Sequence, residues 1–393
     1  MDINRRPYLL SAVVGQEKLK TAYLANIVNP SIGGLLISGP KGTGKSTIVH
    51  AVGTILPDYD AVEGCDFNCD PARPRRFCTQ CRERAEIKSI RKNMRIVNLP
   101  LSCTEDRLIG SVDVETLLKT GQKKVQVGIL GEAHRNILYV DEVNLLPDHL
   151  VDDILDAAAS PWNTIEREGI SITHPAEFVL VGTMNPEEGE LRPQILDRFP
   201  LCANVTSIFD VRLRSEIVKR NLLFENDPDR FHDTFEKDER AYRDIILRAR
   251  RLLPDVTIRQ KLILGIAEAC ATLKVDGQRP DIVIVKTSLT IAALEDRRSV
   301  SPEDILLAAE LALCHRTRDG GLLEPPTLED IQTTLVKAFK NQGAVEIVED
   351  AGAVVSGSDV KVDRDIDRFM TRSADKSGKS ETSNGDSSAK KKR

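Results

Sequence analysis

Apolar runs alternate with amphipathic segments along the first half of the chain. The apolar runs are short and bounded by glycine, polar or charged residues, so they predict buried strands. They lie within 33–39, 93–101, 135–144 and 176–185. The amphipathic segments have helical spacing and separate the runs. They cover 17–30, 47–56 and 148–159. Strands that alternate with helices predict an α/β fold for residues 1–207, with a mostly parallel sheet covered by helices on both faces.

The pattern changes after about Ile208, and helical spacing dominates from there to residue 345. One of these segments, "SPEDILLAAELALCHRT", opens with Ser301, Pro302 and Asp304, which suit an N-cap, a first-turn proline and an early acidic residue. Residues 208–345 are therefore expected to form an all-α domain. Residues 346–393 hold few large apolar side chains and cannot offset the entropy of ordering, which predicts a disordered tail. Its terminal "KKKR" is either a solvated end or a contact for an acidic partner.

The composition narrows the functions that are open to the chain. Its 393 residues are 41% hydrophobic and carry a net charge of −5, which argues against a protein that coats nucleic acid through bulk positive charge. The sequence contains no apolar run of membrane-spanning length, and its N-terminus lacks the apolar core of a secretory signal. We therefore expect a cytoplasmic protein that contacts neither nucleic acid nor membrane directly.

The segment "GPKGTGKST" follows the first predicted strand and precedes a predicted helix. Its spacing is typical of a phosphate loop, in which backbone N–H groups surround the phosphates of ATP. Lys45 is expected to contact the β- and γ-phosphates, and the Ser46 hydroxyl to bind Mg²⁺. The alternative is a glycine-rich turn without a ligand. The predicted nucleotide-binding residues of this loop are Gly39, Pro40, Lys41, Gly42, Thr43, Gly44, Lys45, Ser46 and Thr47.

Polar residues also end two later strands. In "ILYVDEVN", Asp141 is expected to hold the Mg²⁺ through water, and Glu142 to orient or deprotonate the attacking water. The alternative is an acidic turn that faces solvent. Asn185 ends "FVLVGTMN", where its amide either binds the γ-phosphate or the lytic water, or caps the strand.

Arginines follow shortly afterwards in "LRPQILDRF". Arg198 is a candidate arginine finger, which would reach a nucleotide bound by a neighbouring subunit, and Arg192 is the competing candidate. The alternative for Arg198 is an ordinary surface salt bridge.

The order of these motifs resembles the AAA+ ATPases, and the match extends to the I subunit of magnesium chelatase and its homologues. The resemblance covers roughly residues 8–320 and rests on "VVGQEKLK", "GPKGTGKST", "TEDRLIGSVDVE" and the long block 137–199. It implies an AAA+ core with a helical lid and a ring, commonly hexameric, with nucleotide between subunits. It also implies partnership with D and H subunits, and ATP hydrolysis that drives insertion of Mg²⁺ into protoporphyrin IX.

The resemblance adds site residues and inserts. A second sensor arginine is expected near the start of a lid helix, where Arg279 in "GQRPDIVIVK" has the matching place and Lys286 is its rival. Segment 104–134 resembles the family's insert within the second helix. Segment 163–178 alternates apolar and polar residues and predicts a β-hairpin. Both are expected to contact a partner or the central channel, the alternative being solvent-exposed excursions.

Differences in detail leave other functions open. "LSCTEDRLIG" and "DRFPLCANV" depart from photosynthetic members, and some of those lack the cysteine stretch. A chelatase for Co²⁺ or Ni²⁺ and a MoxR-like remodelling protein for another metal-binding client are therefore alternatives. A DNA motor like the minichromosome maintenance helicases is disfavoured by the acidic balance and by the lack of a separate DNA-binding domain.

Four of the eight cysteines lie within an expected insert at 60–92. They are Cys65, Cys69, Cys78 and Cys81. The spacing C-x3-C-x8-C-x2-C predicts a closed tetrahedral Zn²⁺ site of structural type, while an iron–sulfur cluster or free redox-active thiols are alternatives. Mg²⁺ prefers oxygen ligands, so this site is expected to fold a surface loop and not to carry inserted metal. The remaining cysteines are expected to be buried small apolar residues: Cys103, Cys202, Cys270 and Cys314.

Overall fold

A five-stranded parallel sheet forms the centre of the molecule. The computed structural model describes residues 6–112, 125–160, 162–167, 170–189 and 191–344, and the short stretches 356–357 and 360–361. The sheet has the order β11-β1-β10-β7-β4. Its strands are β1 (Leu35–Ser38), β4 (Ile96–Leu99), β7 (Ile137–Val140), β10 (Val179–Met184) and β11 (Leu201–Asn204). Every residue of β1, β7 and β10 is buried, as expected for strands covered on both faces, and the predicted α/β fold is confirmed.

Strand β11 is the one strand of this sheet that the apolar pattern does not predict. It is only four residues long and pairs in parallel with β1, with Leu201 opposite Leu35. Such a short run after Pro200 has no periodicity of its own, and its strand conformation depends on the neighbouring edge of the sheet.

Helices cover the sheet where helical spacing predicts them. The longer ones are α1 (Glu17–Val28), α2 (Lys45–Ala51) and α7 (Asp148–Ala159). Short helices are α3 (Thr79–Arg82), α4 (Glu105–Ile109), α6 (Ile129–Glu132) and α8 (Pro193–Leu196). Single 3₁₀ turns occur at Leu10–Ala12, Pro30–Ile32, Val52–Thr54, Pro74–Arg76, Val143–Leu145, Pro186–Glu188, Leu253–Asp255 and Asp319–Gly321. Among the described residues, no helix is both long and apolar enough to cross a membrane.

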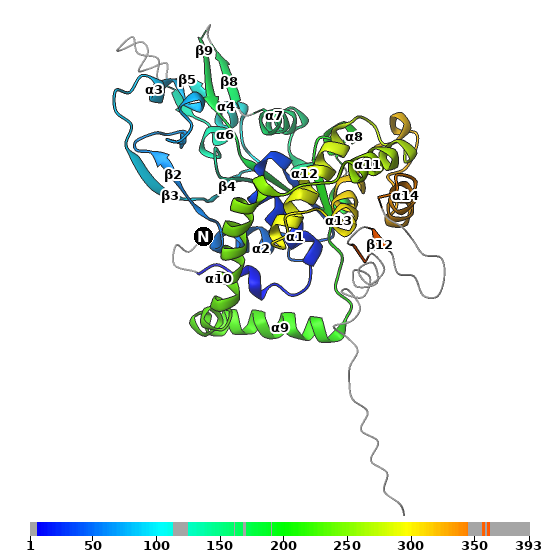
Figure 1. Cartoon of the computed structure of the whole chain (residues 1–393). Helices are drawn as coiled ribbons and strands as arrows, with labels where there is room; N and C mark the ends of the chain where they lie inside the picture. The colour runs from blue at the N-terminus through cyan, green and yellow to red at the C-terminus, as the bar shows by residue number, and fades with distance from the viewer. Residues whose placement is uncertain are drawn as a thin grey trace, which may run out of the picture.

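Antiparallel hairpins extend from this core. β2 (Asp58–Val62) pairs with β3 (Ser89–Asn93) and carries the cysteine stretch. β5 (Gly110–Val112) pairs with β6 (Val125–Val127) between α4 and α6, and β8 (Trp162–Arg167) pairs with β9 (Ile170–Pro175). The β8–β9 hairpin projects away from the sheet beside β5 and α3 (Figure 1). Residues 113–124 and the Glu168-Gly169 turn lie outside the described residues.

A run of helices follows β11. It comprises α9 (Val211–Asn226), α10 (Pro228–Leu252), α11 (Gln260–Thr272), α12 (Arg279–Leu294), α13 (Pro302–Leu313) and α14 (Leu328–Asn341). The expected capping box of Ser301 and Asp304 is present, and Thr327 and Asp330 form another at α14. Most of the tail predicted to be disordered lies outside the described residues. Within it, β12 (Ser356–Gly357) pairs with β13 (Val360–Lys361).

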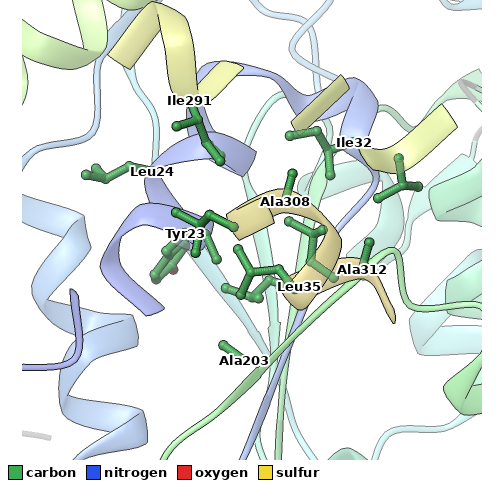
Figure 2. Close-up of a cluster of buried hydrophobic side chains, with 14 of the residues drawn as sticks. Tyr23, Leu24, Ile32, Leu35, Ala203, Ile291, Ala308 and Ala312 are labelled. Carbon is green, nitrogen blue, oxygen red and sulfur yellow. The ribbon is translucent and has the colours of Figure 1, made fainter. Parts of the chain in front are cut away.

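The helical region shares a hydrophobic core with the sheet. Tyr23 of α1 and Leu35 of β1 belong to the same buried cluster as Ile291 of α12 and Ala308 and Ala312 of α13 (Figure 2). The small alanines let α13 pack closely against β11. The packing therefore fixes the helical region against one edge of the sheet.

Candidate functional site

The predicted phosphate loop joins β1 to α2 at the carboxyl edge of the sheet. Gly42 and Gly44 have φ of 77° and 80°, which side chains rarely tolerate. A Cβ on Gly39 would overlap the backbone carbonyl of Val205. These glycines therefore allow a tight loop between β1 and α2.

Lys45 lies within this loop. Its Nζ donates to the carbonyls of Gly39 at 2.6 Å and Pro40 at 2.9 Å. Partial burial lowers the pKa of Lys45, while the carboxylates of Asp141 and Glu142 oppose that shift. Lys41, at the outer side of the loop, forms an ion pair with Glu188. Lys45 is thus a half-buried cation at the position where phosphate charge is expected.

Asp141 directly follows β7, beside the loop. Its Oδ1 accepts hydrogen bonds from Thr183 at 2.6 Å and from Tyr139 at 2.7 Å, and the Ser46 hydroxyl lies 3.5 Å from the same oxygen. Burial, the largest cause, raises the pKa of Tyr139 to about 12, so its hydroxyl stays protonated and donates. The fold thus brings Ser46 and Asp141 together, 95 residues apart in sequence.

The two other predicted polar residues lie at the same edge. Glu142 has a left-handed backbone with φ of 52°, and its N–H donates to Thr183 Oγ1 at 3.1 Å. Residues that carry a Cβ rarely adopt this backbone conformation, and such backbone strain often marks functional sites. Asn185 is buried and accepts from the Glu187 N–H at 3.3 Å. Its Nδ2 has no hydrogen-bond partner among the described residues, so a donor remains available there.

Arg198, the first finger candidate, lies toward the opposite edge of the sheet. Arg198 comes three residues before Leu201, which pairs with Leu35 at the start of β1, whereas the phosphate loop follows the end of β1. The three residue steps from Leu35 to Ser38 along β1 alone separate the two edges of the sheet by about 10 Å. Arg198 forms ion pairs with Asp152 at 3.2 Å and Asp156 at 2.8 Å on α7.

The competing basic residues have contacts of their own. Arg192 pairs with Asp148, also on α7. Arg279 begins α12; burial and the positive charge of Arg198 lower the pKa of Arg279, and Asp197 opposes them. Lys286 donates to the Ser31 carbonyl at 2.7 Å. Arg198 and Arg279 are therefore neighbours, whereas Lys286 is engaged elsewhere.

A cavity of about 450 Å³ adjoins the phosphate loop. Its size falls in the usual range for small-molecule sites. Besides the loop and the start of α2, it is lined by Tyr8, Val13, Val14, Gln16, Thr206, Ser207, Ile208, Arg214, Ile217, Val218 and Asn221. Sequence reasoning does not name these residues, because they come from an N-terminal segment and, about 200 residues later, from α9 and the connection that precedes it.

Sequence reasoning also missed Tyr139 and Thr183. Each lies two residues before a predicted site residue, Asp141 and Asn185 respectively, and strand alternation places such residues on one face. That spacing is the signal that would have identified them.

The four clustered cysteines are buried together between β2 and β3. Their sulfur atoms lie within 4.8 Å of one another, with Cys65 and Cys78 3.9 Å apart. Tetrahedral Zn²⁺ with Zn–S bonds of 2.3 Å requires sulfurs about 3.8 Å apart, so the donor set fits that ion. Hydrogen bonds from the thiols of Cys69 and Cys78 lower the pKa of Cys65. The Cys78 N–H donates to the Cys69 sulfur at 3.2 Å.

The cysteine loop supports the β8–β9 hairpin. Phe67, between two of the cysteines, stacks on His174 of β9 with ring centroids 4.6 Å apart. The Arg82 guanidinium lies 5.6 Å from the centroid of Trp162 in β8. The position of the hairpin thus depends on the fold of this loop.

Comparison with known proteins identifies the chain's relatives. The family described as magnesium chelatase, subunit ChlI, matches residues 74–196, and the AAA lid domain family matches residues 264–335. The magnesium-chelatase subunit ChlI homolog of Methanocaldococcus jannaschii is 49% identical over 339 residues, which are 85% of this chain and 92% of that protein. The ChlI subunit of Mesostigma viride is 45% identical, over 85% of this chain and 94% of that protein.

Solved structures are also similar. One describes the complex between subunits BchI and BchD of magnesium chelatase; it is 39% identical, covers 84% of this chain and 100% of that chain, and has a TM-score of 0.48. Another, from Cytophaga hutchinsonii, is 19% identical, covers 83% of this chain and 91% of that chain, and has a TM-score of 0.54, which supports the fold alone. With relatives of 45% and 49% identity over 85% of its length, the chain belongs to the magnesium-chelatase ChlI family and is an AAA+ ATPase subunit of that type.

Proposed function

We propose that the chain hydrolyses ATP to drive the insertion of Mg²⁺ into protoporphyrin IX by a chelatase complex. The observation that carries this proposal is the convergence of Lys45, Ser46, Asp141 and Asn185 at one edge of the sheet, in a chain of the ChlI family. The magnesium-chelatase relatives are named as subunits, which supports assembly of this chain with the D and H subunits of such a complex.

Each residue of the edge has a defined task in hydrolysis. Lys45 exchanges the carbonyls of Gly39 and Pro40 for the β- and γ-phosphates. Ser46 and Asp141 hold the nucleotide's Mg²⁺, which supplies positive charge against the phosphates. Thr183 and Tyr139 occupy one oxygen of Asp141 and thereby fix the rotamer of its carboxylate.

Glu142 and Asn185 act on the attacking water. The Glu142 carboxylate accepts the proton of that water as it attacks the γ-phosphorus. The buried Nδ2 of Asn185 donates to the γ-phosphate or to the water, which gives the unpartnered amide a ligand. The adjoining cavity receives the adenosine, since apolar Val13, Val14 and Ile208 line it next to the phosphate loop.

A neighbouring copy of the chain completes the nucleotide-binding site. Arg198 and Arg279 neighbour each other at the edge opposite the chain's own phosphate loop, so they serve the ATP of the next subunit. This arrangement requires a closed ring with one interface repeated around it, for which we propose a hexamer. Because Arg198 lies next to Arg279, we favour Arg198 over Arg192 as the arginine finger.

Mixing two inactive variants tests the shared site. Arg198→Ala retains a phosphate loop, and Lys45→Ala retains the finger. Each variant alone should lose at least about 100-fold in ATPase rate, since trans arginines contribute 10³–10⁵ in related phosphoryl transfer. An equal mixture should recover measurable activity, because some interfaces combine an intact loop with an intact finger. Arg212→Ala, an exposed arginine of α9, is the control. Absence of any recovery in assembled mixtures would contradict the trans role.

Reconstitution of the chelatase complex tests which metal ion it inserts. The full chain, mixed with the D and H subunits of a magnesium-chelatase relative, MgATP and protoporphyrin IX, should form the magnesium porphyrin, measured by its fluorescence. Lys45→Ala should reduce this rate to background while the subunits still associate. Parallel reactions with Co²⁺ and Ni²⁺ identify a different metal. ATP hydrolysis without insertion of any of the three metals would contradict the chelatase function and leave a remodelling ATPase.

The four clustered cysteines form a second part of the proposal, a structural metal site. We propose that they hold one structural Zn²⁺, because four buried thiols with tetrahedral spacing form a closed site with no position for a substrate. Zn²⁺, when bound, links the ends of a loop that has only a small hydrophobic cluster of its own.

A further inference from the structure

A second group of metal-binding side chains lies where the helical region meets the sheet. Cys202 belongs to β11, and Cys314 and His315 directly follow α13. The two sulfur atoms and a ring nitrogen of His315 lie within 4.8 Å of one another. The Cys314 thiol donates to the Cys202 carbonyl at 3.5 Å, although 112 residues separate the two in sequence. These cysteines are therefore more than the isolated apolar residues that the sequence suggested.

The histidine is oriented as a ligand. Its Nε2 lies 2.8 Å from the Phe199 carbonyl, which can only accept, so Nε2 carries the proton. The lone pair of Nδ1 then faces the Cys314 thiol, whose sulfur lies 3.9 Å away at hydrogen-bond distance. A backbone carbonyl that fixes the imidazole in this way is the usual support of a metal-binding histidine.

The charges around the group also suit a cation with thiolate ligands. Two thiolates balance a divalent ion, and the imidazole remains neutral. Arg316 is buried beside them, where it donates to the Phe199 carbonyl at 3.0 Å and pairs with Asp197 at 3.8 Å. Its guanidinium places a further positive charge near the two sulfur atoms.

We propose that Cys202, Cys314 and His315 form a second, exchangeable metal site for a thiophilic divalent ion such as Zn²⁺. Two thiolates and one imidazole are ligands that Zn²⁺ accepts, and three protein ligands leave its fourth position open. Cys314 is partly exposed, which gives the ion access. The bound ion ties β11, and with it the loop that carries Asp197 and Arg198, to the end of α13. A disulfide between Cys202 and Cys314 is the competing chemistry.

Titration of the metal-free, reduced full chain with Co²⁺ tests the site. The wild type should bind two ions per chain, one at the four-cysteine cluster and one at the new site. Cys314→Ser should bind one, and should lose about a third of the sulfur-to-cobalt absorbance, because two of the six thiolates belong to the new site. Cys270→Ser, which removes a buried thiol outside both groups, should match the wild type. Equal stoichiometry and absorbance in Cys314→Ser and wild type would overturn the proposal.

A second measurement avoids any loss of fold in the variant. In the wild-type chain, Zn²⁺ should slow alkylation of Cys314 at least tenfold, as read by mass spectrometry, with Cys270 as the internal reference. Zn²⁺ should also raise the thermal unfolding midpoint of Cys270→Ser more than that of Cys314→Ser. Alkylation of Cys314 at the same rate with and without Zn²⁺ would refute the site. So would a Cys202–Cys314 disulfide that forms equally fast with and without Zn²⁺ when oxidised glutathione is added to the reduced chain as the electron acceptor.

Discussion

Glu142→Gln should bind ATP normally and lose at least about 100-fold in hydrolysis rate. The substitution keeps the size of the side chain but removes the carboxylate that accepts the proton of the attacking water, a contribution of about 10²–10⁴ in rate. Binding should persist because Lys45, Ser46 and Asp141 are untouched. The Glu142 N–H to Thr183 bond is a backbone contact and also survives. Single-turnover hydrolysis and equilibrium binding of a fluorescent ATP analogue separate the two effects.

Glu187→Gln is the matched control for that experiment. Glu187 is an exposed acidic residue two positions after Asn185, and its backbone N–H donates to the Asn185 side chain. Its variant should hydrolyse ATP within about twofold of the wild-type rate, as surface substitutions usually have small effects. A Glu142→Gln variant with near-wild-type turnover would show that another group accepts the proton.

The paired substitution Cys78→Ser/Cys81→Ser should remove one Zn²⁺ per chain and unfold the cysteine loop. Binding of structural Zn²⁺ contributes about 10–16 kcal/mol in small zinc-folded peptides, far more than the small apolar cluster of this loop can replace. Metal analysis should report the loss of the ion, and limited proteolysis should cleave between β2 and β3 at a rate that the wild type does not show. Basal ATPase activity should stay within about twofold, because the loop contributes no residue to the phosphate edge.

The same variant separates structural from partner effects. Loss of the Phe67–His174 stacking should release the β8–β9 hairpin, so stimulation of the ATPase by partner subunits should fall while basal hydrolysis remains. Cys103→Ser, outside the loop and also buried, should keep its metal and its partner response. Unchanged Zn²⁺ content in the double variant would exclude a structural site at these cysteines.

The sequence alone determined the parts of this protein that depend on neighbouring residues. The phosphate loop is a continuous segment whose glycines permit the required backbone, and Asp141, Glu142 and Asn185 each end an apolar run. Continuous apolar runs mark strands that are covered on both faces, and helical spacing marks the buried face of each helix, so most strands and helices of the core could be predicted from the sequence.

The tertiary structure decided what depends on distant segments. Strand β11 exists because β1 offers it an edge, and its register places Arg198 opposite the chain's own phosphate loop. The cavity beside that loop, the shared core of α13 and the sheet, and the Cys202–Cys314–His315 group join residues that local patterns treat separately. Local sequence encodes backbone preference and burial, whereas the meeting of remote side chains is set by strand order and packing, which no single segment contains.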